Sequence, residues 1–248
     1  MIQDILPLHL QNQYEKKQPD DTSYMMIYRE NKILVREGET LAFLTYRELR
    51  EICETAGEMA PQSIYLFSVG EETYFLTELP EHLTPEGYCF EKMFAVRSGK
   101  PKEHILAAAT AWHLYEWYRD NRFCGRCGQK LMHNGTLRML FCPACGNQVF
   151  PKIAPAVIVG VTDGEKSSDE RVPFIHYYKS QPWGFDQNLL LGYFCELDGE
   201  RDIVLDTGEL ATAEWVHYSD VPEDPEGLSL TREMMSVFQK NFTSEKMS

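Results

Sequence analysis

Residues 161–185 read VTDGEKSSDERVPFIHYYKSQPWGF, and the two ends of this stretch carry different signals. The first end closes an apolar, β-branched run that begins at Ala156, and its Asp-Gly turn is typical of the end of a strand. The other end, from Ser180 to Phe185, is a compact polar and aromatic motif. Only fifteen residues lie between Gly164 and Ser180. Any catalytic segment placed between the two signals would therefore have to be short.

The composition indicates a folded protein of one large domain or two to three small ones. Of the 248 residues, 43% are hydrophobic and 12% are aromatic, which is typical of a globular chain. No apolar run reaches the roughly 18 residues of a membrane span. The N-terminus lacks a basic start followed by an apolar stretch, so we expect a cytoplasmic protein. The net charge of −14 argues against non-specific binding to nucleic acid, because an acidic surface repels phosphates.

Hydrophobic periodicity predicts an N-terminal α+β domain, which we place at residues 1–98. Hairpins are expected at 24–37, turning near Asn31 and Lys32, and at 63–79, turning around Gly70. A short helix is expected between them, over 45–57. Its apolar face comprises Tyr46, Leu49, Ile52 and Cys53.

A linking helix is expected at residues 99–121, and Pro101 stands at its start, where a missing N–H costs nothing. His104 and His113 lie on this helix, and we interpret both as packing or surface residues. After residue 150, the last domain, 151–248, should contain further strands and a closing helix. The strands are expected at 156–164, 189–197 and 213–218, and the helix at 231–242.

Four of the seven cysteines form two Cys-x2-Cys pairs, separated by fourteen residues, within 122–150. Each pair can present two thiolates from one tight turn, and two such turns close the tetrahedral S4 site that structural zinc prefers. A disulfide or redox pair is the alternative, but it needs an oxidising compartment or a thioredoxin-like setting that the sequence does not indicate. We therefore predict a structural zinc ribbon. Its ligands are Cys124, Cys127, Cys142 and Cys145.

The order of these motifs resembles the NADH pyrophosphatase family of Nudix hydrolases. The resemblance is carried by the ribbon, by FPKIAPAVIV at 150–159 and by SQPW at 180–183, and it extends from about Tyr24 to Phe242. It implies an N-terminal α+β domain, a zinc ribbon and a Nudix-type α/β/α sandwich. It also implies a homodimeric hydrolase, dependent on Mg²⁺ or Mn²⁺, that cleaves NADH or NAD to nicotinamide mononucleotide and AMP. Members are also associated with removing NAD caps from RNA.

The catalytic Nudix box of that family is missing where it should lie. The box reads Gly, five residues, Glu, seven residues, then Arg-Glu-apolar-x-Glu-Glu-x-Gly-apolar, which needs about 23 residues. Gly164 and Glu170 have the spacing of its head, but Tyr178 stands where the Arg is due, and Pro173 would obstruct the helix. We therefore expect a truncated sandwich with weak or absent hydrolase activity, in which one sheet face and one edge are exposed.

A partial match to the box occurs upstream. Glu39 is followed, after seven residues, by Arg47-Glu48-Leu49-x-Glu51. Ile52 then stands at the position of the second paired Glu, and it shares the apolar face of the expected helix. We interpret this segment as an ordinary docking helix.

The resemblance assigns roles to several residues outside the box. It implies that a dinucleotide pocket is shaped by Ser180, Gln181, Trp183 and Phe185, and that Phe150 stacks on a base. Glu209 matches a further metal ligand, although a single carboxylate is a poor Mg²⁺ site. Many members have Pro where this chain has Gly184. On the alternative interpretation, Trp183 and Phe185 are core aromatics in a loop.

Two further functions stay open. The chain could be an active diphosphatase that uses carboxylates other than those of the box. Alternatively, it could be a zinc-ribbon module for dimerisation or interaction, without a nucleotide function.

Overall fold

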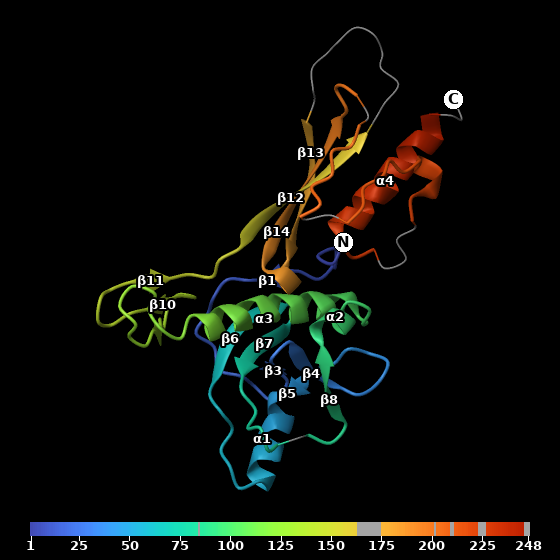
Figure 1. Ribbon diagram of the computed structural model, residues 1–248. Coiled ribbons are helices and arrows are strands. Elements are labelled where there is room, and N and C mark those ends of the chain that lie inside the picture. The colour runs from blue at the N-terminus through green and yellow to red at the C-terminus, as the bar shows by residue number, and fades with distance from the viewer. Residues whose placement is uncertain (84, 163–174, 201, 209–210, 223–226, 246–248) are drawn as a thin grey trace. The chain divides into compact units, whose positions relative to one another are not determined.

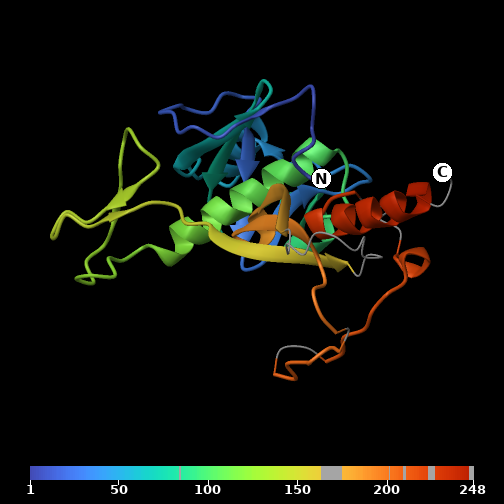
Figure 2. The same cartoon turned by 90° about the horizontal axis from the view of Figure 1, so that it is seen from above.

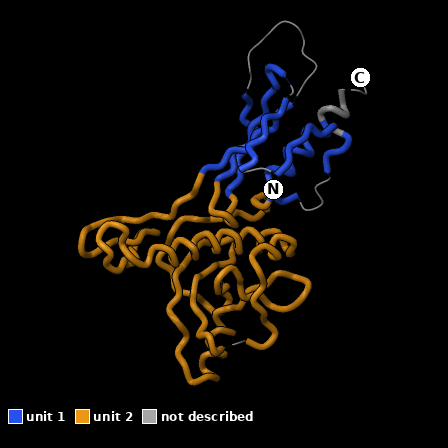
Figure 3. Tube along the Cα trace, viewed as in Figure 1, with its two compact units in different colours: residues 1, 155–182, 189–248 blue, residues 2–154, 183–188 orange. Residues whose placement is uncertain are grey.

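The computed structural model describes the chain in two compact units (Figures 1 and 3). Unit 1 comprises Met1, residues 155–182 and residues 189–248, and unit 2 comprises residues 2–154 and 183–188. The described residues are 1–83, 85–162, 175–200, 202–208, 211–222 and 227–245. No helix within these ranges is long and apolar enough to cross a membrane. The fold is mixed α and β with several sheets; the four-part division expected from the sequence stays a prediction.

The N-terminal part of unit 2 is built on a five-stranded sheet with the order β1-β6-β7-β2-β5. Its strands are β1 (Leu10–Gln11), β2 (Tyr24–Met26), β5 (Leu44–Thr45), β6 (Ser63–Val69) and β7 (Glu72–Thr77). The hairpin expected around Gly70 is confirmed: β6 and β7 pair antiparallel, and Gly70 has a φ of 59°. Only a residue without a Cβ adopts that backbone conformation readily.

The first expected hairpin is confirmed in part. Strands β3 (Tyr28–Arg29) and β4 (Lys32–Arg36) pair antiparallel around a turn at Glu30 and Asn31, and β8 (Tyr88–Lys92) joins them in a separate sheet. Strand β2, however, leaves this hairpin and pairs parallel with β7. The shared core of the two sheets contains Met25, Ile27, Leu34, Leu44, Tyr65, Phe75 and Tyr88.

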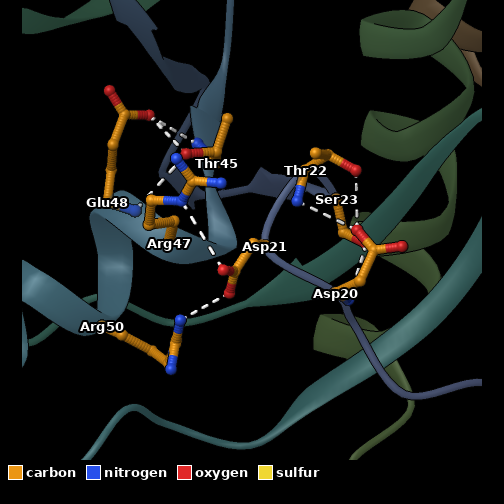
Figure 4. A network of polar contacts seen from close by, with 8 residues as sticks. All are labelled: Asp20, Asp21, Thr22, Ser23, Thr45, Arg47, Glu48 and Arg50. Carbon is orange, nitrogen blue, oxygen red and sulfur yellow. Dashed lines mark hydrogen bonds and ion pairs between the residues drawn. The ribbon is translucent and has the colours of Figure 1, made fainter.

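Helix α1 (Tyr46–Thr55) lies where the sequence predicts a helix, and it buries Leu49 and Cys53. Thr45 and Glu48 form a reciprocal capping box at its start (Figure 4). Such a pair supplies partners for backbone N–H groups that the first helical turn leaves open. The expected helix and its apolar face are therefore confirmed, and Ile52 also packs against the core.

Helix α2 (Met93–Val96) and the long helix α3 (Lys102–Asp120) follow. Pro101 caps α3, and the helix buries Ile105, Ala109 and Trp112. The two histidines of this helix contact main-chain oxygens: His104 Nδ1 lies 2.5 Å from Leu41 O, and His113 Nε2 lies 2.6 Å from Lys152 O. Neither histidine belongs to a metal-ligand cluster of the described residues.

The segment after α3 forms a small three-stranded sheet in unit 2 (Figure 2). Its strands are β9 (Met132–His133), β10 (Leu140–Phe141) and β11 (Gln148–Val149). They surround a core of Trp117, Leu131 and Leu140 together with Cys124 and Cys142. Two-residue strands provide few hydrogen bonds, so this part depends on the small core to which two of the cysteines belong.

Unit 1 contains a three-stranded sheet with the order β12-β14-β13 and the closing helix α4 (Leu230–Glu245). Its strands are β12 (Ala154–Thr162), β13 (Ile175–Trp183) and β14 (Asn188–Glu196), and the short helix η2 (Tyr218–Asp220) also belongs to unit 1. The short helix η1 (Gly184–Asp186) belongs to unit 2. Met234 of α4 lies close to Gly160 and Gly192, so this helix covers one face of the sheet.

The opposite face of that sheet is apolar and exposed. Val157 is 62% exposed, Val159 and Val161 are also exposed, and Tyr177 packs edge-on against Tyr193 with ring centroids 5.7 Å apart. The expected exposure of a sheet face is thus present in the described part of the chain. Whether unit 1 is a truncated Nudix-type sandwich stays a prediction.

The prediction of a strand at 213–218 is wrong. Residues 213–217 form no regular structure, and Tyr218 begins η2. Trp215 and Val216 are exposed. Alternating apolar residues form a strand only where a neighbouring strand pairs with them, and no such pairing is present here.

Candidate functional site

The four cysteines of the two pairs converge on one point, and their Sγ atoms lie within 4.8 Å of one another. Cys124 and Cys145 are 3.6 Å apart, Cys127 and Cys142 are 3.4 Å apart, and all four are free thiols. A tetrahedral zinc site with Zn–S bonds near 2.3 Å has S···S edges of about 3.8 Å. The cluster therefore has the ligands and the size that zinc needs.

Both pairs place their thiols with the same backbone turn. Cys124 N–H donates to Gln129 O at 2.7 Å, Gly128 N–H donates to Cys124 O at 2.8 Å, and an equivalent pair of bonds surrounds Cys142. Gly128 and Gly146 close the turns with φ values of 74° and 71°. This conformation favours glycine, which explains why a glycine follows each pair.

The thiols differ in acidity. The N–H of Arg126 donates to Cys124 Sγ and lowers the pKa of that thiol to about 6. The pKa of Cys127 rises to about 12, because hydrogen bonds from its thiol to the sulfurs of Cys142 and Cys145 outweigh the backbone N–H of Gln129. Thiols this close cannot all ionise without a cation, so metal binding would replace shared protons.

Gln181 of β13 is fully buried, and both ends of its amide are used within unit 1. Its Nε2 donates to Leu228 O at 2.7 Å, and its Oε1 accepts from Leu230 N at 2.6 Å. The side chain thereby holds the first residue of α4. Ser180 lies beside it in β13 and is partly buried.

The signature aromatics Trp183 and Phe185 belong to unit 2. Trp183 ends β13 and is only 7% exposed, and its Nε1 donates to Asp186 Oδ2 at 3.1 Å. Its ring lies 5.0 Å from that of Phe185. Phe150 also belongs to unit 2 and is 49% exposed. The burial of Trp183 fits the core interpretation, whereas the open ring of Phe150 is accessible to a ligand.

Gly184 explains why η1 lies so close to α3 inside unit 2. A Cβ at this position would lie 2.4 Å from Ala109 O and 2.8 Å from its carbonyl carbon. A backbone atom cannot move aside as a flexible side chain can, so this contact requires glycine. Gln187 supports the same contact by donating from Nε2 to Glu116 Oε2 at 2.7 Å.

Carboxylates do not gather around a second metal position in the described part of the chain. The four cysteines are the only group there in which three or more potential ligands converge. Glu209 lies outside the described residues, as do Gly164, Glu170 and Pro173. Glu48, from the upstream partial match, accepts hydrogen bonds from Thr45 and Tyr88 and forms an ion pair with Arg36.

The contacts of two residues near the signature were not predicted from the sequence. Arg97 lies over the Trp183 ring, with Cζ 5.0 Å from the centroid, and Asp186 accepts from the Trp183 indole. Arg97 is far from Trp183 in the sequence, so no local pattern indicates their contact. Many members of the resembled family have proline at the position of Asp186. The resemblance therefore predicts no hydrogen-bond partner for its carboxylate.

Comparison with curated proteins finds similarity to NAD-capped RNA hydrolases called NudC. The NudC of Pseudomonas putida is 28% identical over 159 residues, which cover 49% of this chain and 57% of that protein. The NudC of Escherichia coli O157:H7 is 26% identical over 159 residues, covering 49% and 62%. The NudC of Deinococcus radiodurans is 27% identical over 169 residues, covering 52% and 60%. No protein-family model matches the chain.

These matches confirm the resemblance to the NADH pyrophosphatase family. The chain spans about three fifths of the length of these relatives. For the Pseudomonas protein, 49% of 248 residues is about 122, whereas the match extends over 159, a difference of about 37. For the Deinococcus protein, 52% of 248 is about 129, against 169, a difference of about 40. The relatives thus carry residues inside the matched region that this chain lacks.

Proposed function

We propose that this chain is a dinucleotide-binding relative of the NAD(H) diphosphatases whose own hydrolase activity is weak or absent. The observation that carries the proposal is the fifteen-residue interval before Ser180, which is too short for the metal-binding glutamate helix. The difference of about 37 residues within the match supports it, because a loss of that size accommodates the box together with a neighbouring strand.

The proposal also concerns Glu209. Diphosphate hydrolysis of this kind needs several carboxylates around Mg²⁺ or Mn²⁺. Glu209 on its own would make a poor site for either ion, so we propose that it is a vestigial ligand.

The proposal also covers the metal, the ligand, the localisation and the oligomeric state. Zinc in the four-cysteine cluster would be structural, since four thiolates leave no open coordination position. The ligand would be NAD(H) or a related dinucleotide, and the exposed ring of Phe150 would stack on one of its bases; NAD-capped RNA is a ligand by analogy with the named relatives. We further propose that the protein is cytoplasmic and forms a homodimer.

The test is isothermal titration of NADH and NAD into the zinc-loaded protein, with and without Mg²⁺. Chromatography of each mixture then measures AMP. We expect binding without AMP. AMP formation at ordinary rates would overturn the proposed loss of activity and favour carboxylates other than those of the box. In that case Glu209→Gln should lower the rate, and an unchanged rate would exclude Glu209 as a ligand.

A second function is favoured by the exposed valines of β12. A contiguous apolar sheet face on a folded protein commonly marks a contact surface. On this alternative the chain is a zinc-ribbon module for dimerisation or interaction, with no nucleotide function. It predicts a dimer by light scattering and no heat of NAD binding. A monomer that binds NAD would exclude it.

A further inference from the structure

In unit 2, one arginine lies over two aromatic rings. The Cζ atom of Arg97 lies 5.1 Å from the ring centroid of Phe94 and 5.0 Å from that of Trp183. The Trp183 ring is in turn 5.0 Å from the ring of Phe185. These separations are within the roughly 6 Å over which a cation is attracted to a ring face. We call Phe94, Arg97, Trp183 and Phe185 the Arg97 stack.

Arg97 differs from the other cations that lie over rings in the described part of the chain. Each of the others also has an oxygen partner, whereas Arg97 has no hydrogen bond or ion pair from its side chain. Those partners are Glu15 for Lys17, Leu79 O and Pro80 O for Arg29, Glu48 for Arg36, Asp21 for Arg50, Asp120 for Arg119 and Glu233 for Lys179. A lone guanidinium is unexpected in a chain of net charge −14.

The geometry shows which part of Arg97 is available. Its Nε is buried without a hydrogen-bond partner, and it is the only nitrogen of the side chain in that condition. The two terminal nitrogens therefore face solvent. They form the planar pair of donors that matches phosphate oxygens, and the nearby rings of Phe94 and Trp183 restrict the movement of that pair.

Phe94 offers an exposed aromatic surface beside the guanidinium. Helix α2 buries Met93 and Val96 but directs Phe94 outward, and its ring is 77% exposed. One face of the ring is turned to Arg97. The exposed ring offers a planar apolar surface beside a free guanidinium. Nucleobases stack on such rings with roughly 1–3 kcal/mol per base.

We propose that the Arg97 stack binds a nucleotide, with its base on Phe94 and its phosphate on Arg97. The inference rests on the proposed function in that a dinucleotide provides both groups. It adds Phe94 and Arg97, which lie outside the signature and outside the ribbon, to the residues that contact the ligand. It also explains why a charged side chain and a large ring are left without partners of their own.

Isothermal titration with AMP tests the proposal, and adenosine serves as the ligand without phosphate. Phe94→Ala should weaken AMP and adenosine alike, by roughly fivefold to hundredfold. Arg97→Gln should weaken AMP by about tenfold and leave adenosine unchanged. Arg97→Lys, which keeps the charge but loses the planar fork, should give an intermediate loss. The control is Met59→Ala, because Met59 is a 92% exposed apolar residue elsewhere in unit 2.

Two results would overturn the inference: AMP that does not bind the wild type, or AMP that binds Phe94→Ala and Arg97→Gln as tightly as the wild type. Titration with NAD separates this inference from the proposed function. NAD binding that both variants leave unchanged would overturn the inference and leave the proposed function standing. If both variants weaken AMP binding and NAD does not bind, the inference stands and the proposed function is overturned.

Discussion

Replacing Gln181 by leucine should destabilise unit 1 by about 2–6 kcal/mol. The substitution removes both hydrogen bonds of the amide and leaves Leu228 O and Leu230 N without partners. Both residues are buried, so water does not replace the lost bonds. Each unsatisfied buried group costs about 1–3 kcal/mol. Because whole domains are stable by only about 5–15 kcal/mol, a loss of this size is easily measured.

Urea unfolding followed by circular dichroism gives the free energy, and hydrogen exchange locates the loss. We expect peptides from the start of α4 to exchange faster while those of the five-stranded sheet do not change. The matched control is Gln148→Leu, since Gln148 is exposed and such substitutions usually cost less than about 0.5 kcal/mol. A Gln181→Leu protein with wild-type stability and a protected α4 would refute the reasoning.

Gln181→Glu provides a second test of the same contact. The carboxylate can still accept from Leu230 N, but it cannot donate to Leu228 O unless it is protonated. Burial raises the pKa of such a carboxyl in the folded state. The variant should therefore be closest to wild-type stability in acid, and it should lose stability as the pH rises through that folded pKa.

Three further changes test other parts of the structure. Cys142→Ala should abolish zinc binding, measured by metal analysis, and accelerate exchange in the ribbon, whereas Cys89→Ala should retain the metal. Gly184→Ala should lower the free energy of unfolding by about 1–3 kcal/mol, because its Cβ would overlap Ala109 O. The urea midpoint should fall accordingly, and an unchanged midpoint would contradict that contact. Glu233 has a lowered pKa: burial would raise it, but hydrogen bonds from a lysine and a tyrosine of β13 outweigh burial. Its stabilisation is therefore present above the unfolded pKa and lost as the pH falls through the lower folded value. Glu233→Gln should cost up to about 1 kcal/mol at neutral pH and flatten the acid limb of the stability profile.

Features with local signals were predictable from the sequence. The start of α1 follows from Thr45 and Glu48, three residues apart, and the turn of the second hairpin follows from Gly70. The turns of the four-cysteine cluster follow from spacing, because Cys-x2-Cys closes a turn whatever surrounds it. In each case the residues that determine the structure are also neighbours in the chain.

Features that depend on distant partners were not predictable. The resemblance assigns Gln181 to a ligand pocket, yet its hydrogen-bond partners lie 47 and 49 residues further along the chain. The segment around Trp215 has a strand-like pattern, but no neighbouring strand pairs with it. Arg97 and Trp183 meet only because the chain returns to unit 2 after β13. A pattern read along the chain contains no information about these encounters.

The close approach at Gly184 limits what the signature loop tolerates. Many proteins of the resembled family have proline at this position, but a Cβ here would lie 2.4 Å from Ala109 O. Grafting that proline into this chain would therefore displace the backbone of η1 from α3. The signature loop and the long helix beside it can thus change only together.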